Sequence, residues 1–262
     1  MPEPVRYDVT DTVATITLDA PDSLNALTVA MKASLLGALE KAAQADDVRA
    51  VVLTGAGRGF CVGQDLKEHA EALAAGGGHA LDTVREHYNP IVRAITGMPK
   101  PVVAAVNGTA AGAGAALAFA CDFRIASETA SFLMAFARVG LGPDTGASWT
   151  LQRLVGYGRA AAMLMLAEPV TAAQALEMGL VNAVVPVADV ADAADELARR
   201  LAAGPTAAYA GIKQALAVAA TADLNAALET EADVQARCGG TDDHRAAVEA
   251  FLAKQAPTFT GH

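Results

Sequence analysis

The sequence predicts an α/β fold that is followed by a helical module. Short runs of β-branched residues alternate with helical stretches up to about residue 187, which is typical of strands connected by helices. Beyond that point the pattern is helical only. With 53% hydrophobic residues among 262, the chain has enough apolar side chain for a sizeable core. We expect an α/β core over residues 1–200 and a helical module over residues 201–262.

The N-terminal part predicts a β-hairpin and a third strand. Residues 5–18 contain two runs of alternating Val, Ile and Thr that are interrupted at residues 10–12, as in a hairpin. Residues 49–55 form a nearly continuous apolar run, which indicates a buried strand.

A helix is expected between the hairpin and the third strand. Residues 28–44 carry apolar side chains at helical spacing, and Thr28 is suited to cap the helix. Lys32 lies off this apolar stripe, which places it on the polar face.

The middle of the chain repeats the alternation. Residues 100–106 predict a strand, residues 112–120 a helix and residues 123–126 a short strand. Four helical stretches follow residue 187, separated by turn residues at positions 204–205, 221–223 and 239–240.

One uncharged run is long enough to span a bilayer. It covers residues 101–121, but it consists mostly of Ala and Gly and contains Asn107 and Thr109 near its middle. This composition favours a buried strand, a glycine turn and a buried helix, so we expect no membrane span.

The charge balance excludes several classes of partner. The chain carries 19 Lys and Arg against 29 Asp and Glu, for a net charge of −10. Such an acidic protein is unsuited to broad electrostatic binding of nucleic acid or an anionic membrane. Its cysteines form no CxxC pair and no metal-ligand spacing with histidine, so we expect no disulfide framework and no metal site. With no secretory signal pattern, a cytoplasmic location is expected.

Two glycine-rich turns follow predicted strands. The first carries Gly55, Gly57 and Gly59, and the second carries Gly112 and Gly114. Neither completes the pattern of a dinucleotide- or nucleotide-binding loop. Glycine turns of this kind are commonly places where small residues let two backbones pack closely.

Five segments, in their order and spacing, resemble the crotonase, or enoyl-CoA hydratase/isomerase, superfamily. The resemblance covers nearly the whole chain. The segments are SLNAL (23–27), GRGFCVGQDL (57–66), KPVVAAVNGTAAGAG (100–114), GLGPDTGAS (140–148) and AQALEMGLVNAVVP (173–186).

The resemblance implies a crotonase (ClpP-like) spiral of ββα units with a C-terminal helical trimerisation region, and hence a homotrimer or a dimer of trimers. It implies an acyl-CoA thioester as the substrate, with coenzyme A as part of that substrate and no separate cofactor. In the family two backbone N–H groups hold the thioester carbonyl, and they correspond here to Gln64 and Ala113. Small neighbours let such amides reach the oxygen, and the Ala113 amide would begin a helix, where peptide dipoles favour negative charge.

Other residues of these segments are expected to contact the substrate. Lys67 or Arg58 would contact the phosphates of coenzyme A, and Phe136 and Leu141 would line an apolar acyl pocket. Cys61 is expected to be a small buried residue, since no histidine is placed by sequence to activate it as a nucleophile. The complete set of expected substrate-binding residues is Asn25, Ala26, Cys61, Gly63, Lys67, Gly112, Phe136 and Leu141.

Three polar residues nearby have structural interpretations. Asp65 is suited to cap a helix that begins at Leu66. His79 and His87 are expected to face solvent.

The two glutamates of typical hydratases of the superfamily are missing. The first would lie in the helix after the second glycine turn, where this chain has Ala116, and the second would lie at Phe136. Without that general acid and base we expect weak hydratase activity at best.

Asp144 offers a different carboxylate. Its local sequence suits a cap for the helix that runs through residues 149–154. The resemblance favours catalysis, because an Asp here matches the ring-1,2-epoxyphenylacetyl-CoA isomerases of bacterial phenylacetate breakdown, as do HYNPIVRAITGMPKP (87–101) and FLMAFARVGLGPDTG (132–146). One carboxylate beside an oxyanion hole suits a proton shuttle on an enolate. Apolar neighbours would raise its pKa.

Two alternatives remain open, and a third lacks the residues that it needs. One is an enoyl-CoA hydratase or lyase whose water is placed by other groups. Another is an acyl-CoA-binding protein without catalysis. The third is a halobenzoyl-CoA dehalogenase, in which an Asp at this point acts as nucleophile with a histidine and a tryptophan, but those positions are Asn89 and Phe136 here. The acyl group of the substrate does not follow from the sequence.

Overall fold

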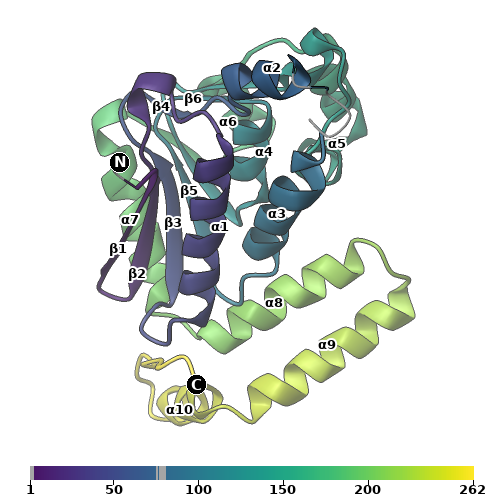
Figure 1. The fold of residues 1–262 in the computed structure, drawn as a ribbon. Helices are drawn as coiled ribbons and strands as arrows, with labels where there is room; N and C mark the ends of the chain where they lie inside the picture. The colour runs from purple at the N-terminus through teal and green to yellow at the C-terminus, as the bar shows by residue number, and fades with distance from the viewer. Residues whose placement is uncertain (1–2, 75, 77–80) are drawn as a thin grey trace.

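The computed structural model describes residues 3–74, 76 and 81–262. A large sheet carries helices on both faces, a smaller sheet lies at one end of it, and a helical hairpin lies at the opposite end (Figure 1). The expected α/β fold with a helical C-terminal part is confirmed.

The large sheet has six strands in the order β1-β2-β3-β5-β7-β10. The hairpin strands β1 and β2 are antiparallel, and every later pairing in this sheet is parallel. Asp11 and Thr12 make the hairpin turn with φ of 48° and 66°. Strands β3 and β5 are apolar nearly throughout because helices cover both of their faces. The bounds are β1 Val5–Thr10, β2 Val13–Leu18, β3 Ala50–Gly55, β5 Val102–Val106, β7 Phe123–Ser127 and β10 Ala183–Val185.

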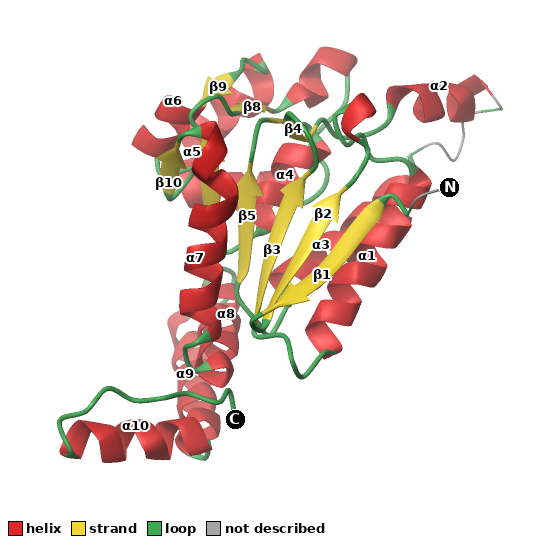
Figure 2. Cartoon of the chain, turned by 90° about the vertical axis from the view of Figure 1, so that its left-hand side faces the viewer, coloured by secondary structure: helices red, strands yellow, loops and turns green. Residues whose placement is uncertain are grey.

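Helices on the two faces of the sheet bury two separate apolar clusters. On one face lies α7 (Val190–Ala202), which contributes Val190, Ala194, Ala198 and Ala202 at a spacing of four residues. The other face is covered by α1 (Val29–Gln44), α3 (Asn89–Thr96) and α4 (Ala113–Ala120), as Figure 2 shows. Helix α1 is capped as expected, since the Thr28 hydroxyl accepts a 3.1 Å hydrogen bond from the Met31 N–H.

The smaller sheet consists of short strands in the order β4-β6-β8-β9. Strands β4 and β6 run parallel, as do β6 and β8, while β9 is antiparallel to β8. Because parallel strands end at the same edge, the turns that follow β4 and β6 lie beside each other. The bounds are β4 Gly59–Cys61, β6 Thr109–Ala111, β8 Ser131–Leu133 and β9 Val170–Thr171.

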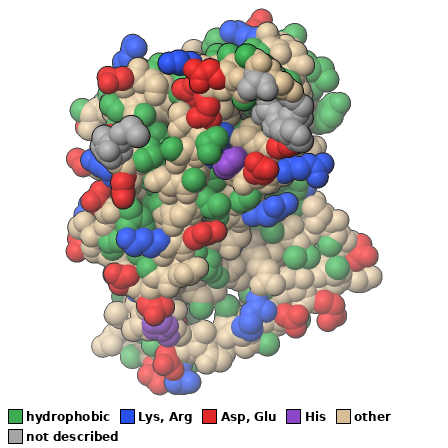
Figure 3. Space-filling view, in the orientation of Figure 1, with side chains coloured by type: hydrophobic (Ala, Val, Ile, Leu, Met, Phe, Trp, Pro, Cys, Tyr) green, Lys and Arg blue, Asp and Glu red, His purple; other side chains and the backbone are tan. Residues whose placement is uncertain are grey.

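The uncharged run 101–121 folds into β5, β6 and α4. No helix within the described residues is long and apolar enough to cross a membrane. Acidic and basic side chains are interspersed over the face seen in Figure 3, so the net charge is not gathered into one patch on that face. The remaining elements are η1 Pro21–Ser23, α2 Leu66–Ala74, η2 Val84–Tyr88, η3 Ala135–Val139, α5 Ala147–Leu166, α6 Ala172–Glu177 and η4 Val187–Asp189.

The chain ends in an α8–α9 hairpin and α10. Lys213 of α8 attaches the hairpin to the core through a 2.6 Å ion pair with Asp122, which also accepts a hydrogen bond from the Val102 N–H at the start of β5. Large apolar side chains remain exposed on these helices, at Ile212, Leu216, Leu224, Leu228, Val248, Phe251 and Leu252. The bounds are α8 Thr206–Ala219, α9 Leu224–Gly239 and α10 Asp242–Leu252.

Candidate active site

The turn that follows β4, which carries Gly63, touches the second glycine turn identified in the sequence. Gly63, after β4, has φ of +86°, and a Cβ at this position would lie 2.8 Å from the Ala111 carbonyl oxygen and 3.2 Å from the Ala113 nitrogen. A Cβ at Gly114 would overlap the carbonyl group of Cys61. Both positions therefore require glycine, and the backbone of one turn lies directly against the backbone of the other.

Each turn presents a backbone donor. Ala113 is the first residue of α4, so its N–H has no acceptor within the helix. The Leu27 N–H donates to the Gly63 carbonyl (2.7 Å), and the Asp65 N–H donates to the Leu27 carbonyl (3.3 Å). These two hydrogen bonds flank Gln64 and do not use its N–H. Within the described part of the chain neither donor has an acceptor. Two unpaired N–H groups on touching turns suit an oxygen that gains negative charge.

The Gln64 side chain is held by buried polar groups. Its Oε1 accepts hydrogen bonds from the Tyr88 hydroxyl at 2.6 Å and from Lys32 Nζ at 3.1 Å. Lys32 also donates to Thr83 Oγ1 at 2.6 Å, and its ammonium lies 4.9 Å from the centroid of the Tyr88 ring. Lys32 and Tyr88 are each only 1% exposed.

The expectation that Lys32 lies on the polar face of α1 is therefore wrong. Helix α1 packs against α3 and η2 as well as against the sheet, so a second flank of the helix is covered. The buried ammonium keeps polar partners there, as a charge away from water must.

The expectation that His87 faces solvent is met only in part. This side chain is only partly exposed, and its Nδ1 lies 3.1 Å from Thr83 Oγ1, which connects it to Lys32. His79 lies outside the described residues.

The carboxylate of Asp144 does not cap a helix. Helix α5 begins at Ala147, its N-cap Gly146 makes no side-chain cap, and both Thr145 and Gly146 have positive φ (52° and 73°). This turn directs the backbone carbonyl of Asp144, not its side chain, to the Ala147 N–H. The carboxylate accepts a 2.7 Å hydrogen bond from the Thr145 hydroxyl. The capping interpretation is thus wrong, and no helix cap occupies the carboxylate, which could act as an acid or a base.

The charge of Asp144 is coupled to the buried polar groups. Burial raises the pKa of Asp144, while the Thr145 hydrogen bond and the Lys32 charge oppose that rise. Burial lowers the pKa of Lys32, opposed by the carboxylates of Glu68 and Asp144. The pKa of Tyr88 is raised, mainly by burial and next by the charge of Asp144. Asp144, Lys32 and Tyr88 thus form one electrostatic unit.

The other expected site residues have varied surroundings. Asn25 is completely buried and its Nδ2 donates to the carbonyls of Ala56, Gly59 and Phe60, so its side chain serves the turn rather than a ligand. Ala26 is buried beside it. Asp65 caps α2 as expected, accepting a 2.8 Å hydrogen bond from the Glu68 N–H.

The residues around the donors are mostly apolar and inert. Burial raises the pKa of Cys61 to about 12, so this fully buried thiol is no nucleophile. Phe136 is buried, and Leu141 is 39% exposed and donates its N–H to the Phe136 carbonyl. Lys67 is exposed on α2.

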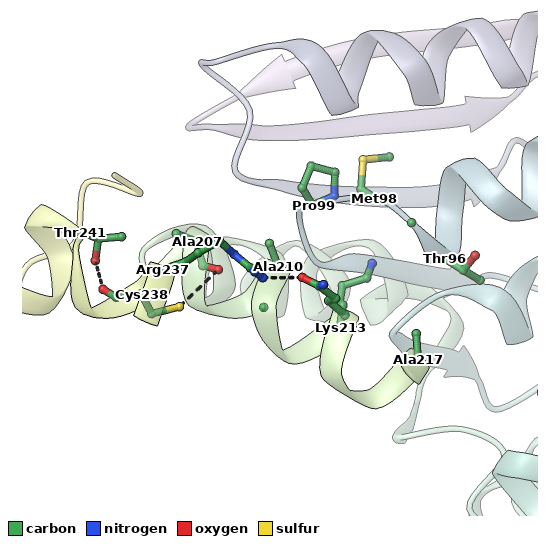
Figure 4. Close-up of a pocket in the computed structure, with 13 residues that line it drawn as sticks. Thr96, Met98, Pro99, Ala207, Ala210, Lys213, Ala217, Arg237, Cys238 and Thr241 are labelled. Carbon is green, nitrogen blue, oxygen red and sulfur yellow. Dashed lines mark hydrogen bonds between the residues drawn. The ribbon is translucent and has the colours of Figure 1, made fainter. Parts of the chain in front are cut away.

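One groove among the described residues lies away from these turns. It encloses about 600 Å³ between α8, α9 and residues 96–99, with Lys213 and Arg237 on its walls (Figure 4). None of its lining residues is an expected site residue or a carboxylate. The groove therefore offers no carboxylate that could act as a general base. No cluster of His, Cys, Asp or Glu side chains in the described ranges is placed to hold a metal ion.

Comparison with known proteins decides the family. The model of the enoyl-CoA hydratase/isomerase family matches residues 8–262. The chain belongs to the enoyl-CoA hydratase/isomerase family. Similarity to known enoyl-CoA hydratases/isomerases therefore extends over both the α/β core and the C-terminal helices.

Individual relatives carry both activities in their names. A Rhodobacter capsulatus protein assigned as an enoyl-CoA hydratase is 46% identical over 98% of each chain. The 1,2-epoxyphenylacetyl-CoA isomerase of Escherichia coli is 44% identical over 95% of each chain. A solved structure from Mycobacterium abscessus, assigned to the enoyl-CoA hydratases/isomerases, has 49% identity and a TM-score of 0.94 over 98% of this chain and 100% of that one.

Within this family member the expected hydratase positions carry no acid or base. Ala116 is completely buried in α4, and Phe136 is buried in η3. Sequence analysis did not identify Lys32 and Thr83 as part of the site. Tyr88 was not predicted either, although it lies within HYNPIVRAITGMPKP (87–101), one of the segments that carry the family resemblance.

Proposed function

We propose that this enzyme isomerises acyl-CoA thioesters through an enolate, with Asp144 as the proton shuttle. The observation that carries the proposal is one half-buried carboxylate, free of any capping role, whose charge acts on Lys32, the hydrogen-bond partner of Gln64. Gln64 lies in one of two touching turns that carry unpaired N–H groups. Loss of one such donor typically costs about 2.7–4 kcal/mol of barrier, so the pair supplies a large part of the required stabilisation.

The proposed reaction needs one carboxylate. Asp144 removes a proton from the carbon beside the thioester, or from the carbon that is conjugated to it, and the electron pair of the broken C–H bond moves onto the thioester oxygen. The N–H groups of Gln64 and Ala113 hold that oxygen. Asp144 then returns the proton to another carbon of the same anion. Burial helps, because a raised pKa makes Asp144 a stronger base.

The proposed substrates are 3-enoyl-CoA and ring-1,2-epoxyphenylacetyl-CoA. The second is supported by the Escherichia coli relative, named 1,2-epoxyphenylacetyl-CoA isomerase. With that substrate the enzyme would act in phenylacetate catabolism. Coenzyme A enters as part of the substrate, and the proposed chemistry uses no separate cofactor.

The decisive experiment compares the wild type with Asp144→Asn on both substrates in deuterated water. The wild type should isomerise and incorporate deuterium, without net hydration of crotonyl-CoA. Asp144→Asn should lose at least about 100-fold in kcat, as expected for a general base. Unchanged isomerisation by Asp144→Asn would overturn the role of Asp144. Binding without turnover of any thioester would instead favour a non-catalytic acyl-CoA-binding protein.

A second candidate is an enoyl-CoA hydratase or lyase. It is favoured by the Rhodobacter capsulatus relative assigned as a hydratase. It is disfavoured by Ala116 and Phe136, which offer no group to activate water. Net hydration of crotonyl-CoA at rates comparable with isomerisation would favour this candidate.

Coenzyme A and assembly complete the proposal. Exposed Lys67 or Arg58 would contact the coenzyme A phosphates, and Lys67→Ala with unchanged affinity would remove Lys67 from that role. The exposed apolar side chains of α8–α10 support assembly into a homotrimer or a dimer of trimers. The proposed location of the enzyme is the cytoplasm. Sedimentation velocity reads the oligomeric state, and a monomer would overturn the assembly.

A further inference from the structure

Lys32 places a buried positive charge against the side chain of Gln64, one of the two proposed donor residues. Three groups hold its ammonium: Gln64 Oε1 at 3.1 Å, Thr83 Oγ1 at 2.6 Å and the Tyr88 ring at 4.9 Å to the centroid. With 1% exposure, the charge has little water to screen it. A buried ammonium in such a fixed position exerts a strong field on its neighbours.

The charges of two carboxylates from different elements act on this ammonium. Glu68, from α2, accepts hydrogen bonds from the Val29 N–H at 3.0 and 3.1 Å, so the first turn of α1 already stabilises its charge. Asp144, from the turn before α5, acts on Lys32 and Tyr88, and Thr145 is the one hydrogen-bond partner of its carboxylate among the described residues.

The other titratable groups in this region lie one step further out. His87 is linked to Lys32 through Thr83, and Cys61 faces Tyr88. Neither contributes to the shift of Lys32 itself, where only Glu68 and Asp144 act besides burial. Of the groups that act on Lys32, only Asp144 changes charge in the proposed reaction.

We propose that Lys32 is a positioning and charge-balancing residue for the isomerisation, an inference that rests on the proposed function. Before proton transfer the negative charge is on Asp144. After the C–H bond breaks and the O–H bond forms on Asp144, the negative charge is on the thioester oxygen, next to the Gln64 N–H. Lys32 donates a hydrogen bond to the side chain of Gln64, and its charge also acts on Asp144, so the same cation can stabilise the negative charge at both locations. Lys32 keeps its proton throughout.

The test uses two substitutions at Lys32 and one matched control. Lys32→Met removes the charge at similar volume, Lys32→Arg keeps it, and Lys41→Met makes the first change at an exposed lysine of the same helix, over the Tyr7 ring. Lys32→Met should lower kcat about tenfold or more with KM changed less than about twofold, because the cation acts on moving charge. Lys32→Arg should retain most activity, and Lys41→Met should match the wild type.

The pH profile separates this role from a merely structural one. Without the neighbouring cation, the pKa of Asp144 rises, so the acidic limb of kcat in Lys32→Met should move to higher pH. If Lys32→Met has the wild-type kcat, and its kcat falls at the same acidic pH as that of the wild type, the inference is overturned. Lys32→Gln replaces Lys32→Met if that variant does not fold.

A readout without turnover keeps the inference distinct from the proposed function. Carbon-13 NMR titration follows the Asp144 carboxyl, whose signal is assigned by its loss in Asp144→Asn. A higher Asp144 pKa in Lys32→Met than in the wild type and Lys41→Met supports the inference even if no thioester is isomerised. An unchanged Asp144 pKa overturns it even if the wild type proves to be an isomerase.

Discussion

The Tyr88 hydroxyl donates a 2.6 Å hydrogen bond to the side-chain carbonyl of Gln64, the residue whose backbone N–H is one of the two proposed donors to the thioester. This bond joins η2, at the start of α3, to the turn after β4. Tyr88 is buried, so water cannot replace the bond. The orientation of the Gln64 turn thus depends on a residue distant from it in sequence.

Tyr88→Phe should therefore weaken both stability and catalysis. Removing the hydroxyl leaves Gln64 with Lys32 as its remaining partner and should cost about 1 kcal/mol of unfolding free energy. Catalysis should fall by more than this loss of stability explains, because the donor turn is less well oriented. Urea unfolding and kcat for 3-enoyl-CoA check the two effects. A kcat equal to wild type would show that the bond serves folding alone.

The pH dependence of kcat should report Asp144. Its pKa is raised by burial above the ordinary value of about 3.9, and the base must be ionised to accept a proton. As the pH is lowered, kcat should therefore begin to fall at a pH above about 3.9, where Asp144 takes up its proton. A pH–rate profile measured with saturating substrate checks this, and full activity down to about pH 4 would contradict it.

Asp144→Asn should stabilise the fold while it removes activity. Because the folded state binds the Asp144 proton more tightly than the unfolded chain does, stability falls as the pH rises from the unfolded to the folded pKa, and it stays lower above that range. A neutral amide avoids this loss. Thermal unfolding at neutral pH should give a higher Tm for Asp144→Asn, and the gain should vanish below the unfolded pKa. A lower Tm at neutral pH would contradict the burial of an unfavourable charge.

Gly63→Ala should disrupt the contact between the two donor turns. Its φ of +86° disfavours a side chain, and the added Cβ would lie 2.8 Å from the Ala111 carbonyl oxygen. We expect a loss of about 1–3 kcal/mol of stability together with activity. Gly37→Ala is the control, because it lies within α1 with open space around it and should be neutral or stabilising by up to about 1 kcal/mol. Chemical unfolding of both variants checks the contrast.

Two ion pairs of the C-terminal helices should differ in importance. Lys213→Met breaks the partly buried pair with Asp122 and should cost about 1–3 kcal/mol, since Asp122 keeps a charge that it can no longer share with a cation. Arg245→Met breaks an exposed pair with Asp242 and should change stability by less than about 1 kcal/mol. Equal effects in urea unfolding would show that the α8 contact does not fasten the hairpin to the core.

Local signals predicted most of the large sheet and its helices. The hairpin, the Thr28 cap and the apolar strand β5 each follow from residues that are close in sequence. The small sheet followed only from the family resemblance, because strands such as β4 and β6 have three residues and show no alternation.

The burial of Lys32 could not be predicted from residues that are close to it in the sequence. Its partners Gln64 and Thr83 lie 32 and 51 residues along the chain, so only the packed structure brings them to the ammonium. The cap position of α5 was missed for a different reason. A positive φ at Thr145, a residue that rarely adopts one, shifts the start of the helix past Asp144.

The contact between Gly63 and the backbone at Ala111 and Ala113 also bears on how relatives diverge. Both proposed donors are backbone N–H groups in the turns after two paired parallel strands, β4 and β6. Exchanging side chains around them therefore leaves these N–H groups, which would hold the thioester oxygen, in place. In the proposed mechanism the acid–base half of the chemistry would be carried by separate side chains, such as Asp144, which can be replaced one residue at a time. Relatives with 44–46% identity can thus carry the names of different reactions on one inherited framework.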